Sequence, residues 1–205
     1  AALQAAITPR TRALIVNSPH NPSATVWTRD EMMTLGELLR ATDILLISDE
    51  VYEHMVFDER PHVSASSIET LAERAFVVSS FGKTYHVTGW KVGYVVAPAS
   101  LSAEFRKVHQ FNFRTEQSGI YFIHQFNVFT VNTPVQHGLA RFMSNPTPYL
   151  ELPAFYQRKR DLFLQGLRRT RLKPLHTEGS YFQCVDYSAV SDLKEADFCQ
   201  WLARE

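Results

Sequence analysis

The sequence predicts an α/β protein built on a mostly parallel sheet that is covered by helices on both faces. Three short apolar runs, at 13–16, 44–47 and 75–78, are rich in branched side chains and do not alternate with polar residues. Such uninterrupted runs are typical of strands buried on both faces, as in parallel sheets. Helical spacing of apolar residues between the first two runs gives the order strand, helix, strand. We therefore expect three layers: helices, sheet and helices.

Local signals delimit the first elements. The first run ends in turn-forming residues at 17–23, where two prolines fix the backbone around Asn21. Thr28 and Glu31 then fit a capping box, in which each side chain satisfies the other residue's free backbone N–H. Leucine and methionine residues recur at helical spacing after it. These signals predict a helix over about 28–41.

Prolines and changes of periodicity delimit the later elements. The prolines at 145–148 interrupt the chain before a long amphipathic run. We expect one domain over 1–146, followed over 147–205 by a long linking helix and the start of a smaller α+β domain. The remaining expected elements are helices near 67–74, 100–110, 134–144 and 149–170, and strands at 92–98 and 180–187.

Composition narrows the class of partner. The chain has 21 basic and 21 acidic residues, so it lacks the basic surface that nucleic acids or anionic membranes attract. The longest apolar runs are far shorter than the roughly 18 residues that a membrane span requires. Cys184 and Cys199 lack the spacing of a metal site or of a disulfide framework. We therefore expect a cytoplasmic protein that binds a small molecule, with no metal, nucleic acid or membrane partner.

Three polar residues follow the predicted strands. Asn21, Asp49 and Lys83 each come after a buried-looking run. Taken singly, they are explained by an ordinary turn, a helix N-cap and a solvated surface lysine. Their coincidence favours a site, because ligands of open α/β sheets bind at the carboxyl ends of strands. A lysine amine forms a Schiff base with an aldehyde cofactor, and a carboxylate keeps a pyridine nitrogen protonated.

Three segments carry a family resemblance: Asn-Ser-Pro-His-Asn-Pro-Ser at 17–23, Ser-Asp-Glu-Val-Tyr at 48–52, and Ser-Phe-Gly-Lys-Thr-Tyr-His-Val-Thr-Gly-Trp-Lys-Val-Gly at 80–93. In this order and spacing they resemble the fold-type I pyridoxal-phosphate enzymes, specifically the class I and II aminotransferases. The subgroup acting on methionine, kynurenine and glutamine is the most similar. The resemblance implies part of the large domain of a pyridoxal-phosphate-dependent transferase and extends along nearly the whole chain.

The resemblance implies a role for each matching residue near the cofactor ring. Lys83 would hold pyridoxal 5′-phosphate as a Schiff base and later move the proton at the substrate Cα. Asp49 would pair with the pyridinium nitrogen. Asn21 and Tyr52 would hydrogen-bond the phenolic oxygen of the ring, and the bond between Asn21 and Pro22 is expected to be cis.

The resemblance also implies ligands for the cofactor phosphate, and the chain departs from the family at two places. Ser80 and Lys91 would bind the cofactor phosphate. Ala24 stands where the family commonly has glycine, which takes a positive φ at lower cost. Residues 111–125 are extra and lie beside a repeated His-Gln-Phe-Asn, at 109 and 124, so we interpret them as a local insertion. The family places this region near a dimer interface, which implies a homodimer.

The predicted function is a transaminase that exchanges the amine of a methionine-like, aromatic, kynurenine-like or glutamine-like amino acid with a 2-oxo acid. Two other activities use the same fold: a pyridoxal-phosphate-dependent carbon–sulfur β-lyase, and the effector-binding domain of a transcription regulator. The chain begins without methionine and stops within a helical pattern, so we expect an internal fragment. Its matched segments include no upstream phosphate-binding turn, ring-stacking aromatic residue or downstream substrate-binding arginine, so an inactive truncated product is a further alternative.

Overall fold

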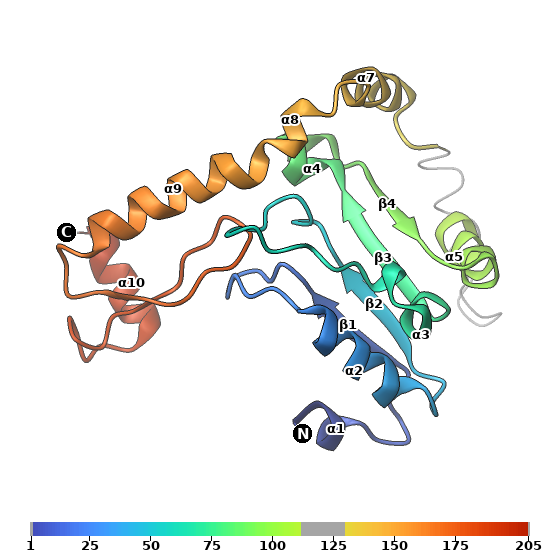
Figure 1. The fold of residues 1–205 in the computed structure, drawn as a ribbon, viewed down its shortest axis with the longest axis horizontal. Helices are drawn as coiled ribbons and strands as arrows, with labels where there is room; N and C mark the ends of the chain where they lie inside the picture. The colour runs from blue at the N-terminus through green and yellow to red at the C-terminus, as the bar shows by residue number, and fades with distance from the viewer. Residues whose placement is uncertain (1, 112–129, 205) are drawn as a thin grey trace, which may run out of the picture.

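A four-stranded sheet forms the centre of the computed structural model, which describes residues 2–111 and 130–204 (Figure 1). Strands β1 (Ala13–Asn17), β2 (Leu45–Asp49) and β3 (Ala75–Ser80) run parallel in the order β1-β2-β3-β4. Strand β4 (Gly93–Val96) pairs antiparallel with β3. The mostly parallel sheet predicted from the apolar runs is therefore confirmed. The direction of β4 places its start beside the carboxyl end of β3.

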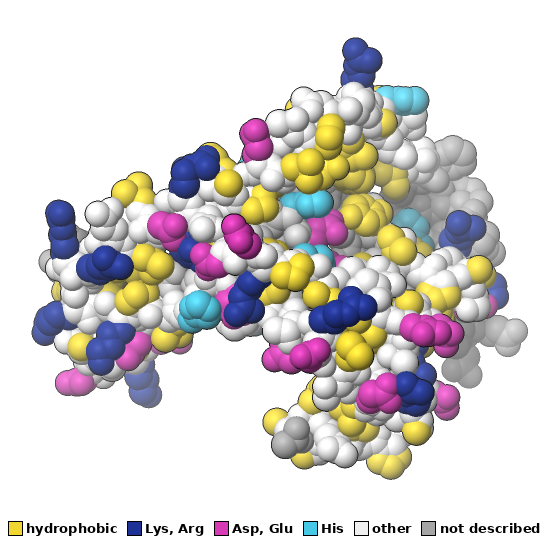
Figure 2. Space-filling model, viewed as in Figure 1, with side chains coloured by type: hydrophobic (Ala, Val, Ile, Leu, Met, Phe, Trp, Pro, Cys, Tyr) yellow, Lys and Arg dark blue, Asp and Glu magenta, His cyan; other side chains and the backbone are white. Residues whose placement is uncertain are grey.

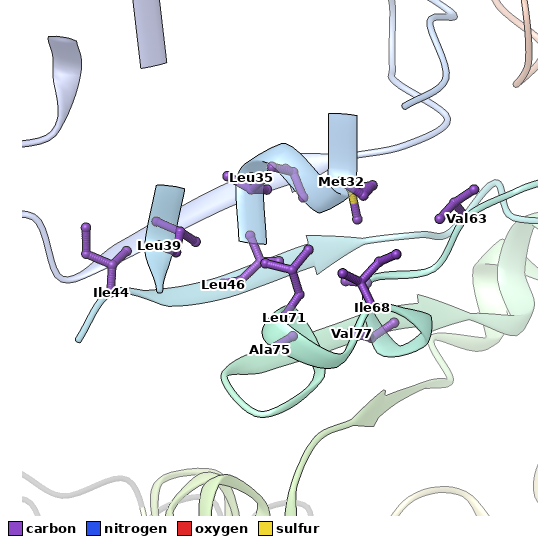
Figure 3. Packing of buried hydrophobic residues seen from close by; sticks show 12 residues of the cluster. Met32, Leu35, Leu39, Ile44, Leu46, Val63, Ile68, Leu71, Ala75 and Val77 are labelled. Atoms are coloured by element: carbon purple, nitrogen blue, oxygen red, sulfur yellow. The ribbon is translucent and has the colours of Figure 1, made fainter. Parts of the chain in front are cut away.

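Helix α2 (Arg29–Leu39) covers one face of this sheet, as the capping box predicts. Thr28 Oγ1 accepts a hydrogen bond from the N–H of Glu31 at 3.3 Å, and Glu31 Oε2 accepts one from the N–H of Thr28 at 2.8 Å. The buried side chains of α2 pack with those of β2 and β3 and of the short helices η1 (Ala65–Ser67) and α3 (Glu69–Ala72) (Figure 3). Burial of these apolar side chains is what holds the layer together.

Helix α5 (Ala99–Phe111) lies on the opposite face. The ring of Phe105 in α5 is 6.2 Å from that of Phe76, whose side chain points away from the α2 face because neighbouring residues of a strand alternate. The helices on the two faces give the three layers expected from the sequence. The proposed insertion at 111–125 and the second copy of the repeat lie outside the described residues, apart from Phe111 at the end of α5.

The predicted limits of the long helix, 149–170, are wrong, because two helices lie in this stretch. Helix α8 (Thr147–Leu150) ends before α9 (Leu152–Leu167) begins. Pro153 lies in the first turn of α9, where its missing N–H is tolerated. A continuous helix would place the Pro153 ring against the carbonyl of Tyr149, so the chain turns there instead. The expected helix at 134–144 is present as α7 (Thr133–Met143).

The strand expected at 180–187 is also largely wrong. Only Val185–Asp186 form a strand, β6, which pairs antiparallel with β5 (Lys173–Pro174). Ser180 has φ 61°, so the backbone turns at this residue and cannot extend as a strand. Helix α10 (Glu195–Arg204) follows at the end of α9 that lies away from the sheet (Figure 1). The division into domains at 146 and 147 stays a prediction.

The helices in the described part of the chain can be compared with the length and hydropathy that a membrane span requires. None of them is both long enough and apolar enough to cross a bilayer. A short α1 (Ala2–Ala6) precedes β1 and completes the described elements of the amino-terminal part.

Candidate active site

The carboxyl ends of β1, β2 and β3 bring three of the predicted site residues to one edge of the sheet. Asp49 is the last residue of β2 and is paired in register with Asn17 of β1 and Val78 of β3. Asn21 lies in the loop after β1, and Lys83 lies in α4 (Phe81–Thr84), directly after β3. Parallel strands share one carboxyl edge, which explains why residues distant in sequence meet there.

Hydrogen bonds of Asn17 fix the loop that carries Asn21. Asn17 Oδ1 accepts from the N–H of Asn21 at 2.8 Å, and Asn17 Nδ2 donates to the backbone oxygen of Asp49 at 2.9 Å. The Ser18–Pro19 and Asn21–Pro22 peptide bonds are cis, the second as expected. Ala24 is buried with φ 60°, so the loop takes a left-handed residue even without the family's glycine.

Tyr52 lies near Asp49 and Asn21 at this edge. It is buried, and its hydroxyl donates to the Tyr181 hydroxyl at 3.4 Å. Burial, the contact with Tyr181 and the charge of Asp49 raise the pKa of Tyr52, while a hydrogen bond with Asn21 lowers it less. Tyr52 therefore keeps its proton at neutral pH and stays a hydrogen-bond donor.

Lys83 joins this group through Tyr181. Lys83 Nζ lies 5.8 Å from the centre of the Tyr181 ring. Burial raises the pKa of Tyr181, but hydrogen bonds with Tyr52 and Lys83 and the Lys83 charge outweigh it, so the pKa lies below its ordinary value. Lys83, Tyr181 and Tyr52 thus lie together at the strand ends, joined by the contact of Lys83 with the Tyr181 ring and by the Tyr52–Tyr181 hydrogen bond.

The two predicted phosphate ligands lie at the neighbouring strand pair. Ser80 ends β3 and is paired in register with Gly93 of β4. Lys91 precedes Gly93 by two residues, is exposed and has φ 54°. Because β3 and β4 are antiparallel, Ser80 and Lys91 come to the same end of the pair, next to the residue that starts α4.

Sequence reasoning missed Tyr181, which the structure brings to the site from the carboxyl-terminal part of the chain. The N–H groups of Glu178 and Gly179 donate to the Ala24 oxygen at 2.9 and 3.0 Å, and the N–H of Ser180 donates to the Met55 oxygen at 2.7 Å. A Cβ on Gly179 would lie 2.7 Å from that Met55 oxygen. The sequence signal for it was Gly179, two residues before Tyr181, because a glycine can mark a close approach of two backbone segments.

Sequence reasoning also missed Glu50, the residue after Asp49. Its side chain is only 2% exposed, and its carboxylate accepts from Ser48 Oγ at 2.8 Å, the N–H of Ala65 at 2.9 Å and His62 Nε2 at 2.9 Å. Glu50 and His62 also place ligand atoms within 4.8 Å of a Glu53 carboxylate oxygen. These three hydrogen bonds satisfy the buried Glu50 carboxylate, and they hold the segment of residues 62–65 against the end of β2.

A hollow lined partly by α8 exposes Glu53 and His62 of this cluster. Figure 2 shows histidine and acidic side chains within the hollow. Glu53 Oε1 accepts from the Tyr94 hydroxyl at 2.8 Å and from Ser79 Oγ at 3.0 Å. Glu53 thereby ties the segment after Tyr52 to β3 and β4. Bonds of this kind position the site residues without being part of the predicted cofactor contacts.

Comparison with known proteins identifies the family. The family model of aminotransferase class I and II matches residues 1–205. A methionine aminotransferase of Escherichia coli K12 is 50% identical over 202 residues, which are 98% of this chain and 48% of that protein. Human kynurenine–oxoglutarate transaminase 1 is 31% identical over 208 residues, 96% of this chain and 48% of the relative.

Solved structures agree with the sequence relatives. A crystal structure of an Escherichia coli methionine aminotransferase has a TM-score of 0.88 and 48% identity, covering all of this chain and 50% of the other. N-Succinyldiaminopimelate aminotransferase of Mycobacterium tuberculosis has a TM-score of 0.86 and 32% identity over the same shares. The chain thus spans about half the length of the relatives that it matches. By its match along the whole of this length, the chain belongs to the class I and II aminotransferases.

Proposed function

We propose that this chain supplies the cofactor-binding centre of a pyridoxal-phosphate-dependent transaminase. The observation that carries the proposal is the meeting of the Lys83 amine, the Asp49 carboxylate and the Tyr52 hydroxyl at the carboxyl ends of neighbouring strands. An amine, an anion and a proton-bearing phenol are the three groups that a hydroxylated pyridine aldehyde can use. The enzyme would transfer an amino group from an amino acid to a 2-oxo acid.

The donor set at the strand ends fits pyridoxal 5′-phosphate. Tyr52 keeps its proton and can donate to a phenolate oxygen, and its contact with Asn21 puts a second donor beside it. Ser80 and Lys91 offer a hydroxyl and a cation at the end of the β3–β4 pair, suited to a phosphate. When bound, the cofactor supplies an electron sink that stabilises negative charge at the substrate Cα.

Each proposed site residue would then have a defined task. The Lys83 amine would hold the cofactor through its aldehyde carbon, with loss of water, and would later carry the proton to and from the substrate Cα. The Asp49 carboxylate would keep a proton on the pyridine nitrogen by charge attraction. Tyr52 and Asn21 would orient the ring through its oxygen, and the Asn17 hydrogen bonds fix the loop of Asn21 to the end of β2.

The substrate, assembly and location are further parts of the proposal. The names of the relatives include methionine and kynurenine, which supports a methionine-like or aromatic, kynurenine-like substrate, and the subgroup resemblance adds a glutamine-like one. We propose a homodimer, as the family resemblance implies, and a cytoplasmic location, in line with the cysteine usage of the sequence.

The test is the absorbance spectrum of the protein with pyridoxal 5′-phosphate, together with amine exchange between methionine and a 2-oxo acid. Lys83→Ala is expected to abolish the visible band and to reduce exchange by at least about 10³-fold, because covalent attachment and proton transfer are both lost. Lys159→Ala is the matched control, since Lys159 lies over the Phe155 ring in α9.

The outcomes separate the proposal from its alternatives. A visible band that persists in Lys83→Ala would contradict the role of Lys83. Release of pyruvate from a sulfur amino acid without an acceptor would indicate a β-lyase, and cofactor binding without turnover would indicate a ligand-binding domain.

A further inference from the structure

A segment from the far end of the chain is built into the edge of the sheet that carries the site. Beyond its bonds to Ala24 and Met55, the backbone oxygen of Glu178 accepts from the N–H of Phe57 at 2.9 Å. The Glu178 carboxylate accepts from the N–H of Val26 at 2.8 Å and pairs with Arg60 at 2.9 Å. Backbone bonds on both sides fix this segment, so the direction of the Tyr181 side chain is set by the fold.

The Tyr181 side chain lies between two groups to which the proposed function gives separate tasks. Its ring meets the Tyr52 ring edge-on, with centres 5.3 Å apart and planes at 89°. Its hydroxyl accepts from the Tyr52 hydroxyl at 3.4 Å, and Lys83 Nζ lies 5.8 Å from its ring centre. Tyr181 is 41% exposed, whereas Tyr52 is 3% exposed, so Tyr181 separates the inner phenol from solvent.

A lysine side chain has four rotatable bonds, and its amine needs a partner to stay in one place. Tyr181 is such a partner, because Lys83 Nζ lies 5.8 Å from its ring centre and an aromatic ring attracts a cation. The lowered pKa of Tyr181 agrees with this contact, since the Lys83 charge lies beside it, whereas burial is the main cause of the raised pKa of Tyr52.

We propose that Tyr181 is a positioning residue that holds the Lys83 amine and the Tyr52 hydroxyl in one arrangement before the cofactor binds. The inference rests on the proposed function and adds a residue to that site. By holding both groups, Tyr181 keeps the amine and the Tyr52 hydroxyl close together, and the Tyr52 proton would turn from Tyr181 to the phenolic oxygen when the cofactor binds.

The first arm of the test needs no cofactor. Tyrosinate absorbance is followed against pH in the complete protein and in Tyr181→Phe, Lys83→Met and Tyr187→Phe. Tyr187 is the matched control, because its hydroxyl donates to the Leu193 oxygen at 3.0 Å, away from the site. The phenol that ionises at the lowest pH is expected to disappear in Tyr181→Phe, to shift to higher pH in Lys83→Met and to persist in Tyr187→Phe.

The second arm measures the rate at which pyridoxal 5′-phosphate attaches to Lys83, trapped by borohydride and located by the mass of the peptide. Loss of one hydrogen bond to a charged group corresponds to a factor of about 10, so Tyr181→Phe is expected to slow attachment about tenfold. Tyr187→Phe is expected to stay within about twofold, in line with the small effect of remote surface changes.

Each arm can overturn the inference separately from the proposed function. A low-pH phenol that survives in Tyr181→Phe, or ignores Lys83→Met, shows that the contact does not exist. Equal attachment rates in Tyr181→Phe and wild type refute the positioning role. No attachment of pyridoxal 5′-phosphate to wild-type protein overturns the proposed function and this role together, while the first arm still decides the contact.

Discussion

Replacing the buried Glu50 by glutamine is expected to lower the free energy of unfolding by about 1.5–3 kcal/mol at pH 7. The change keeps the size of the side chain and removes its charge. Oε1 of glutamine can still accept from Ser48 and Ala65, as Glu50 Oε1 does. Its amide nitrogen replaces the oxygen that accepts from His62 Nε2. The expected loss is therefore that of one hydrogen bond with a charged partner.

His62 cannot easily compensate for this loss. To accept from the new amide, its Nε2 must be unprotonated, and a neutral ring then carries its proton on Nδ1. His62 Nδ1 is buried and has no hydrogen-bond partner among the described residues. The variant can therefore regain a hydrogen bond to His62 only with a ring proton on Nδ1, where no acceptor lies, so the loss is not recovered.

The effect has a defined dependence on pH. Burial raises the pKa of Glu50, but hydrogen bonds from His62, Ala65 and Ser48 and the His62 charge hold it below its ordinary value. A carboxyl with a lowered folded pKa stabilises the protein above its unfolded pKa of about 4.3 and loses this contribution as pH falls through the folded value. The difference between wild type and Glu50→Gln is therefore expected to narrow below about pH 4.

Urea unfolding, followed by tryptophan fluorescence at pH 7, 5 and 3.5, measures the difference. The matched control is Glu37→Gln, because Glu37 pairs with Arg40 in α2 and both side chains are more than 60% exposed. That change is expected to cost less than about 0.5 kcal/mol. Equal costs for the two variants, or a gap for Glu50→Gln that stays constant from pH 7 to 3.5, would refute the reasoning.

Two further substitutions probe the frame around the site. Thr28→Ala is expected to lower the free energy of unfolding by about 1 kcal/mol through loss of the α2 cap; urea unfolding checks this, and an equal loss in Thr28→Ser would contradict it. Gly179→Ala places a Cβ 2.7 Å from the Met55 oxygen and is expected to cost about 1–3 kcal/mol and to slow cofactor attachment. At Gly166 in α9 a Cβ would meet nothing within 4 Å, so Gly166→Ala is expected to be neutral or stabilising by up to about 1 kcal/mol in the same assay. Equal behaviour of the two alanine variants would contradict the close approach at Gly179.

The sequence predicted those features that depend on neighbouring residues. The apolar run of β2 and the capping box of α2 are local signals, and both elements form where they were expected. Asn21, Asp49 and Lys83 could be predicted to lie at one edge because each lies at or just after the end of a strand, and parallel strands bring their ends together. The burial and hydrogen bonding of Glu50 were not predicted, because they depend on Ala65 and His62 meeting it from a later loop.

The sequence by itself determined the class of fold and the residues placed at the strand ends, since periodicity and turn chemistry act over a few residues. Only the tertiary structure decided how the carboxyl-terminal segment meets them. Ser180 turns the backbone with φ 61° where an extended strand was expected, and Tyr181 then reaches Tyr52, 129 residues earlier in the chain. That contact depends on backbone bonds from Glu178 and Gly179 to Ala24, which pair distant loops and leave no periodic pattern in either segment.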